Sequence, residues 1–100
     1  MAKRRAILER WKFPYVQHGG VTLIARKDAV ECVKRILANS CRFYGYDAFT
    51  LFADNKIQPH LDWSTSWPSG TRPSLEGIIS ELAEHPAEVT HYEFVFEDDI

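Results

Sequence analysis

AFTLFADNKIQPHLDW, residues 48–63, has the pattern of a β-hairpin. Its two arms contain β-branched and aromatic residues, and Asp54-Asn55-Lys56 between them has the composition of a tight turn. Pro59 has no N–H to donate, so the returning arm is expected to be an edge strand or to contain a bulge. The hairpin therefore predicts antiparallel pairing between consecutive strands.

Three further segments are predicted to be strands. The aromatic run CRFYGY, residues 41–46, comes before the hairpin, and the β-branched VTLIA, residues 21–25, follows the Gly19-Gly20 turn. In VTHYEFVFE, residues 89–97, apolar and polar residues alternate, which is typical of a strand with one buried face. Residues 64–73 are polar and contain proline and glycine, so they are expected to form a loop.

Helical periodicity appears in three places. Residues 2–12 form a short basic pattern with a narrow apolar stripe. Residues 27–39 place apolar side chains on one face, with Asp28 as the expected N-cap. Residues 74–85 repeat this spacing after Pro73, a residue favoured in the first turn of a helix.

The expected fold is α+β, with an antiparallel sheet of about four to five strands and two to three helices packed on one face. One hundred residues suit a single domain. Residues 1–20 are expected to form a basic helical N-terminal extension, and residues 21–97 the core.

The charges are divided unevenly along the chain. Residues 1–40 hold nine Lys/Arg against three Asp/Glu, and residues 41–100 hold three against eleven. This predicts a basic and an acidic surface, which are either simply solvated or steer a partner of opposite charge. The basic N-terminal surface leaves open a small RNA-binding module, although a pI near 6.0 argues against nucleic acid as the partner.

Several classes of protein find no support in the sequence. Cys32 and Cys41 do not form a CxxC pair, so no metal site and no cofactor is expected. No segment approaches the roughly 20 apolar residues that span a bilayer, and no apolar run of a signal peptide follows the basic N-terminus, so a cytoplasmic protein is expected. No glycine-rich phosphate loop, nucleophile elbow or HExxH motif is present.

An enzyme would have to be built around the histidines. His60 with Asp62, and His91 with Glu93, are each two residues apart and would share a face of a strand. If the two strands were neighbours, these side chains would meet and support acid–base chemistry or a metal. The same spacing occurs on any solvated strand face, so a hydrolase is the weaker hypothesis.

LDWSTSW, residues 61–67, concentrates two tryptophans, a carboxylate and three hydroxyls. Trp63 is either a core residue or part of a surface. Trp67 precedes Pro68-Ser69-Gly70, so it is expected on the rim of a loop, where tryptophan is a typical anchor of a protein interface. On a regular strand the segment divides into two sides, with Leu61, Trp63, Thr65 and Trp67 on one and Asp62, Ser64 and Ser66 on the other.

A resemblance to a known family rests on the order and spacing of five segments. They are DAVECVKRILANS with its mid-helix cysteine, FYGYDAF, LDWSTSW, PSLEGIISELAEH and VTHYEFVF. Through them the chain from about residue 28 to 97 resembles the immunity protein of colicin E-five, the colicin that cuts tRNA anticodons. The resemblance implies a protein that is not an enzyme. It implies one that binds a small basic ribonuclease toxin and blocks its RNA-binding cleft by imitating the anionic, stacked anticodon. Similar immunity modules also partner toxins of contact-dependent growth inhibition.

Carried over by position, the resemblance assigns toxin binding to Asp62, Ser64, Ser66 and Trp67, with Asp47 nearby. Chemistry adds further residues, because tryptophan rings can stand in for stacked bases and carboxylates for phosphates. These are Trp63, Glu97, Asp98 and Asp99. The expected partner is a basic ribonuclease domain, with no membrane and no small-molecule substrate. On this hypothesis Trp67→Ala weakens toxin binding and leaves the fold intact.

Overall fold

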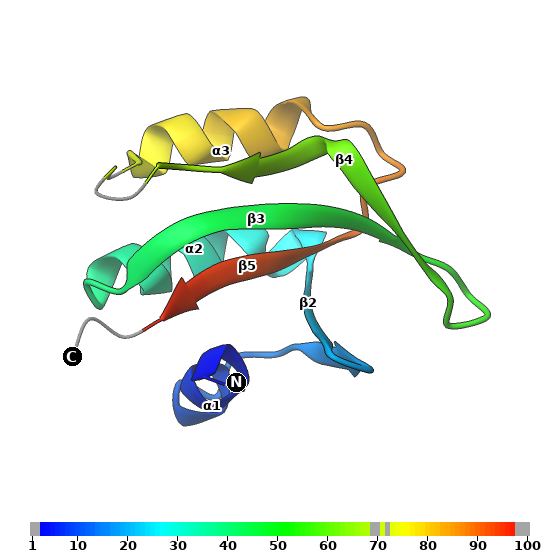
Figure 1. Cartoon of the computed structure of the whole chain (residues 1–100), viewed down its shortest axis with the longest axis horizontal. Helices are drawn as coiled ribbons and strands as arrows, with labels where there is room; N and C mark the ends of the chain where they lie inside the picture. Colours follow the sequence, from blue (N-terminus) through cyan, green and yellow to red (C-terminus); the bar gives the residue numbers. More distant parts are fainter. Residues whose placement is uncertain (1–2, 69–70, 72, 98–100) are drawn as a thin grey trace.

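The computed structural model describes residues 3–68, 71 and 73–97, and these form one five-stranded antiparallel sheet with three helices (Figure 1). The strand order is β1-β2-β5-β3-β4, and every neighbouring pair is antiparallel. The predicted α+β fold is therefore confirmed. The elements follow one another as α1 (Lys3–Arg10), β1 (Val16–His18), β2 (Val21–Ala25), α2 (Arg26–Ala38), β3 (Arg42–Leu51), β4 (Ile57–Ser66), α3 (Leu75–Glu84) and β5 (His91–Glu97).

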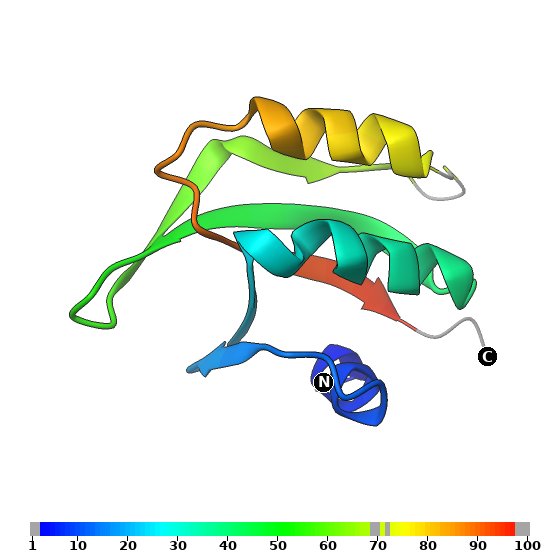
Figure 2. The same cartoon turned by 180° about the vertical axis from the view of Figure 1, so that it is seen from behind.

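The core lies between one face of the sheet and the helices α2 and α3. The alternation in β5 buries Tyr92, Phe94 and Phe96, and the apolar stripe of α2 meets them from behind the sheet in Figure 1 and from the front in Figure 2. In Figure 2, α2 lies in front of β3 and β5. The opposite face of the sheet is therefore free of both α2 and α3.

Two helix starts differ in how they are capped. Helix α2 begins at Arg26 directly after β2, and Ala25 at the N-cap position makes no side-chain cap bond, so the expectation of an N-cap at Asp28 is wrong. Asp28 instead lies in the first turn, where a carboxylate interacts favourably with the helix dipole. Helix α3 begins after Ser74, whose hydroxyl accepts a 3.0 Å hydrogen bond from the Gly77 N–H.

Helix α1 packs beside β5 instead of extending away from the domain. The pairing of β2 with β5 covers only Ile24–Tyr92 and Ala25–His91, and α1 lies beside the other, C-terminal end of β5 in both views (Figures 1 and 2). Its apolar stripe is buried, and Trp11 stacks on Phe96 with ring centroids 5.9 Å apart. The expected N-terminal extension is thus part of the core.

Strand β3 differs from the two strands expected at residues 41–46 and 48–53, because it is one continuous strand with a bulge. Phe43 stands opposite Phe96 and Gly45 opposite Val95, so Tyr44 is the extra residue. Gly45 has a φ of 152° and lies so close to β4 that a side chain there would meet the Thr65 carbonyl oxygen. A glycine at this position lets the strand bend without ending.

Strand β1 was not expected, since PYVQHGG was interpreted only as a break before the Gly19-Gly20 turn. Three residues are too few to show an alternating pattern. Pairing supplies the signal instead, with Val16 opposite Leu23 and His18 opposite Val21. The β1–β2 hairpin also contacts the β3–β4 turn, where a ring nitrogen of His18 lies 2.5 Å from the Asn55 carbonyl oxygen.

Candidate binding surface

The face of the sheet that α2 and α3 leave free brings together three of the predicted site residues. Residues directly opposite in an antiparallel register share a face. Asp47 stands opposite Glu93, and Ser66 stands opposite Gly45, which in turn stands opposite Val95. We use the name open face for the exposed or half-exposed side chains around these positions, which are Arg42, Tyr44, Asp47, Ser66, Val95 and Glu97.

Hydrogen bonds order part of the open face. The Tyr44 hydroxyl donates a 2.7 Å bond to Glu97 Oε1, and Arg42 stands opposite Glu97 across the ladder. The neighbouring Glu93 is mostly buried and accepts a 3.1 Å bond from the Thr22 N–H, while Arg4 of α1 lies 3.9 Å from it. Glu93 therefore joins β2 and α1 to β5, and Asp47, opposite it on β3, is the half-exposed carboxylate of this row. Asp98 and Asp99 lie outside the described residues.

The two tryptophans of LDWSTSW lie on the helix-covered side instead. Trp67 packs edge-on against Phe43 and Tyr46, with ring centroids 5.0 and 6.1 Å away. The backbone N–H of Trp67 donates a hydrogen bond to the Tyr44 carbonyl oxygen. The expectation that Trp67 stands on a loop rim is thus wrong, because β4 continues to Ser66 and leads Trp67 onto the core. Trp63 is half-buried against the His85 ring, at 5.3 Å.

At residues 61–64, β4 contains a large bulge. His60 stands opposite Ala48 and Thr65 opposite Tyr46, so the four residues 61–64 face Asp47 alone. The Ser64 hydroxyl spans the gap, because it donates 2.9 Å to the His60 carbonyl and accepts 3.1 Å from the Ala48 N–H. The two-sided division expected of a regular strand is therefore wrong here. The bulge exposes Leu61 to 83% and leaves Asp62 exposed, while Trp63 turns inward.

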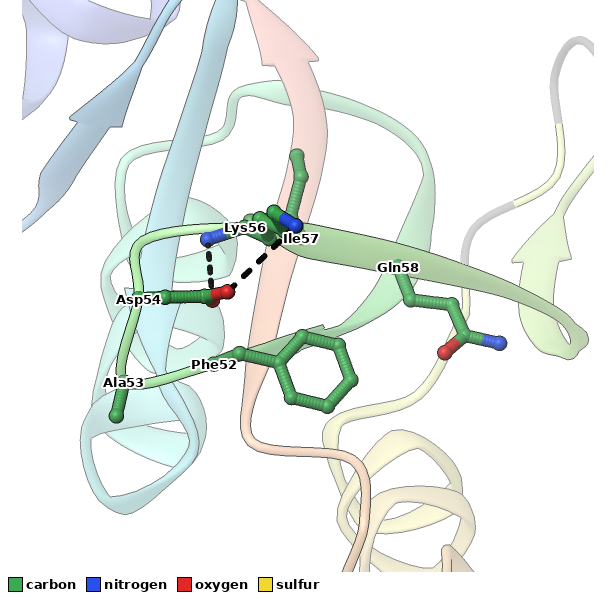
Figure 3. A pocket seen from close by; sticks show the side chains of 6 residues that line it. All are labelled: Phe52, Ala53, Asp54, Lys56, Ile57 and Gln58. Atoms are coloured by element: carbon green, nitrogen blue, oxygen red, sulfur yellow. Dashed lines mark hydrogen bonds and ion pairs between the residues drawn. The ribbon is translucent and has the colours of Figure 1, made fainter.

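The tip of the β3–β4 hairpin forms a shallow hollow (Figure 3). The Phe52 ring, which is 46% exposed, projects into it beside the Gln58 side chain. The carboxylate of the hollow is Asp54. It forms an ion pair with the Lys56 ammonium at 3.8 Å and accepts a hydrogen bond from the Lys56 backbone N–H. The hollow thus offers an apolar ring and a neutralised ion pair, which is not a set of groups suited to catalysis.

The histidines expected to support an enzyme do not meet. Strand β3 separates β4 from β5, and the register places His60 on the helix-covered face and His91 on the opposite one. His60 lies 2.6 Å from the Thr50 hydroxyl and His91 2.8 Å from the Thr90 hydroxyl. Within residues 3–68, 71 and 73–97, no three His, Cys, Asp or Glu side chains are placed to hold a metal ion.

A buried polar cluster that the sequence did not indicate lies behind the sheet. His85 Nδ1 is 2.7 Å from the Tyr92 hydroxyl, and the Tyr46 hydroxyl donates a 2.7 Å bond to Glu81. Desolvation by burial lowers the pKa of His85, and the nearby Arg26 guanidinium lowers it further. Burial also raises the pKa of Tyr46 and Tyr92. His85 ended an expected helix in the sequence, and only the packing of α3 over Tyr46 and Tyr92 encloses it.

Charge is also separated in space. Helix α3 contains three glutamates and no basic residue, and β4 carries Asp62 without a basic residue. Helix α1 holds four basic residues and one acidic residue. Arg4 of this helix pairs with Glu93, and Trp11, which directly follows the helix, stacks on Phe96, so one face of the indole ring is already occupied.

Comparison with known proteins adds no relative: no protein-family model, no curated protein and no solved structure matches the chain. Across the residues that the structure describes, no helix has the length and apolar character needed to span a bilayer.

Proposed function

We propose that the protein is an immunity protein that binds a basic ribonuclease toxin and blocks its active-site cleft. The observation that carries the proposal is the position of Asp47, Ser66 and Glu97. The sequence predicts all three as binding residues; they come from three different strands and lie on the same open face. Such an inhibitor would act in the cytoplasm, on a toxin delivered as a bacteriocin or by contact-dependent growth inhibition.

The chemistry of the open face fits such a partner. A ribonuclease cleft must bind phosphates and is therefore basic, and the carboxylates of Asp47 and Glu97 can form charge-assisted hydrogen bonds with its Arg and Lys side chains. Tyr44 is 37% exposed and supplies an amphipathic ring beside them. The chain continues from Glu97 into Asp98-Asp99, which adds negative charge to the sequence at this end of β5.

The two tryptophans and Ser64 have a different part in this proposal. Trp67 packs on Phe43 beneath the sheet, and Trp63 packs on His85. They support the backbone of β3 and β4 from the helix-covered side, while Ser64 sets the shape of the bulge. Their half-exposed edges remain available at the sheet margin, where Asp62 is also exposed.

The test is co-expression with the protein encoded directly upstream, followed by pull-down and a tRNA-cleavage assay with the purified complex. A stable complex in which cleavage is suppressed is the expected result. The double variant D47N/E97Q should weaken the complex at least tenfold, as loss of two charged contacts predicts. The matched control E76Q/E84Q removes two exposed carboxylates of α3 on the other side of the sheet and should bind like the wild type.

Two results would contradict the proposal. One is the absence of a complex together with salt-dependent retention on RNA, which would favour the basic surface of α1 and an RNA-binding module. The other is a complex in which tRNA cleavage continues, which would show that the cleft is not blocked.

A further inference from the structure

The bulge of β4 presents an apolar side chain in an unusual way. Leu61 is 83% exposed, compared with 46% for Phe52 and 40% for Val16, two other exposed large hydrophobic residues. A single exposed leucine on a protein surface is ordinary and carries little information. Leu61 differs because four residues of β4 stand opposite one residue of β3, so the backbone departs from the sheet where this side chain projects.

The bulge is held in place by contacts at both of its ends. The Ser64 hydroxyl bonds to the Ala48 N–H of β3 and to the His60 carbonyl of its own strand. The Trp63 ring packs on His85, which is itself buried. A loop held in one conformation loses little entropy when it binds, so a side chain that it presents contributes more of its contact energy to affinity.

The position of the bulge connects it to the open face. Asp47, a half-exposed residue of that face, is the one β3 residue opposite residues 61–64, and Asp62, the residue after Leu61, is exposed. The bulge that presents Leu61 thus contains one exposed carboxylate and faces a strand position that holds a second. Interfaces with strong hot spots commonly place an apolar anchor at the centre and charged groups around it.

We propose that Leu61 is the apolar anchor of the toxin interface and inserts into a hydrophobic pocket bordered by Lys or Arg on the ribonuclease. The proposal rests on the function proposed above and names the residue that determines affinity and specificity. The occupant of this surface is a basic protein, since the exposed Asp62 in the bulge and the half-exposed Asp47 opposite it would disfavour an acidic or purely apolar partner.

The experiment measures the Kd of the purified ribonuclease domain for the wild type and for two variants in which an exposed aliphatic side chain is truncated to alanine. The two positions lie on opposite edge strands of the sheet. Leu61→Ala should raise the Kd at least fivefold, or about 1 kcal/mol, the loss that separates the few energetically important residues of an interface from the near-neutral ones. Val16→Ala is the matched control, because Val16 is an exposed aliphatic residue of β1, the other edge strand, and should bind unchanged. Both variants should unfold at the wild-type denaturant midpoint, because neither side chain is buried.

A Kd for Leu61→Ala that stays within fivefold of the wild type would overturn this inference and leave the immunity function in place. Failure of the wild type to bind the ribonuclease would overturn both. Ser64→Ala tests the positioning role separately. It should speed hydrogen exchange at the Ala48 amide and raise the Kd, while Ser64→Thr, which keeps a hydroxyl, should restore both. Faster exchange with an unchanged Kd would show that the rigid bulge has no part in binding.

Discussion

The imidazole of His85 and the phenol of Tyr92 share a hydrogen bond of 2.7 Å in the interior, between α3 and β5. The groups that face this imidazole come from every element packed around it. They are Arg26 of α2, Tyr46 of β3, Trp63 of β4, Tyr92 of β5, and Glu81 and Glu84 of α3. Burial and Arg26 favour the neutral imidazole over the charged one, so protonation of His85 disfavours the folded state.

The stability of the protein should therefore fall as the pH drops below about 6.5, the pKa of an unfolded histidine. The unfolded chain binds the proton more readily than the folded one, because the pKa of His85 is lowered in the folded state. This stability is present above the unfolded pKa and is lost as the pH falls through the folded pKa. Urea unfolding between pH 7.5 and 5.5 measures this loss of unfolding free energy. The pH range lies above the usual pKa values of carboxylates, so it reports mainly on histidines. His85→Gln should flatten the dependence.

His91 is a second contributor to compare in that experiment, because burial lowers its pKa as well. His91→Gln should remove only its own part of the pH dependence. A wild-type midpoint that is the same at both pH values would contradict the prediction for both residues.

Arg26→Lys should reduce the free energy of unfolding by about 2 kcal/mol or more. The Arg26 guanidinium donates hydrogen bonds of 2.7 to 3.0 Å to four backbone carbonyls at and after the C-terminus of α3, those of Leu82, His85, Pro86 and Val89. An ammonium group cannot reach all four with this geometry, so some carbonyls lose their donor. Arg35→Lys, at an exposed position of the same helix, should change the free energy by less than about 0.5 kcal/mol. Equal effects of the two changes, measured by denaturant unfolding, would refute the role given to Arg26.

Gly45→Ala should destabilise the protein by about 3 kcal/mol or prevent folding. The new Cβ would overlap the Thr65 carbonyl oxygen and lie 2.8 Å from Ser66 Cα, at a φ that disfavours any side chain. Gly20→Ala is the control, since nothing lies within 4 Å of its Cβ position. If Gly45→Ala has the thermal midpoint of the wild type, the bulge of β3 is not shaped as described.

Trp67→Ala should now reduce stability by about 1–3 kcal/mol as well as any binding affinity, because the indole packs against Phe43 and Tyr46. Trp67→Phe keeps an aromatic ring in this contact and should be closer to the wild type. Denaturant unfolding measures stability, and toxin binding by the folded fraction measures affinity. A Trp67→Ala variant with wild-type stability would support the original expectation of a loop-rim residue.

Much of the fold was accessible from residue spacing. The alternation in β5, the apolar stripes of α2 and α3 and the turn at Asp54-Lys56 are local patterns, and the structure contains each of them. The edge position inferred from Pro59 is also correct, since β4 is the last strand of the sheet. The candidate site was predicted less well. Trp67, expected on a loop rim, packs partly buried against the core, and Leu61, expected on the same side of the strand as Trp67, is exposed at the bulge.

The sequence by itself determined every element type except the short β1, together with the antiparallel class and the division of charge, because hydrophobic period and composition act over a few neighbouring residues. Only the tertiary structure decided which side chains share a surface. The bulges at Tyr44 and at residues 61–64 exist because the strand registers on either side of them do not match, and a register belongs to a pair of strands. The same reason applies to His85, which is buried by residues far from it in the chain, and to Asp47, Ser66 and Glu97, which the sheet brings onto one face.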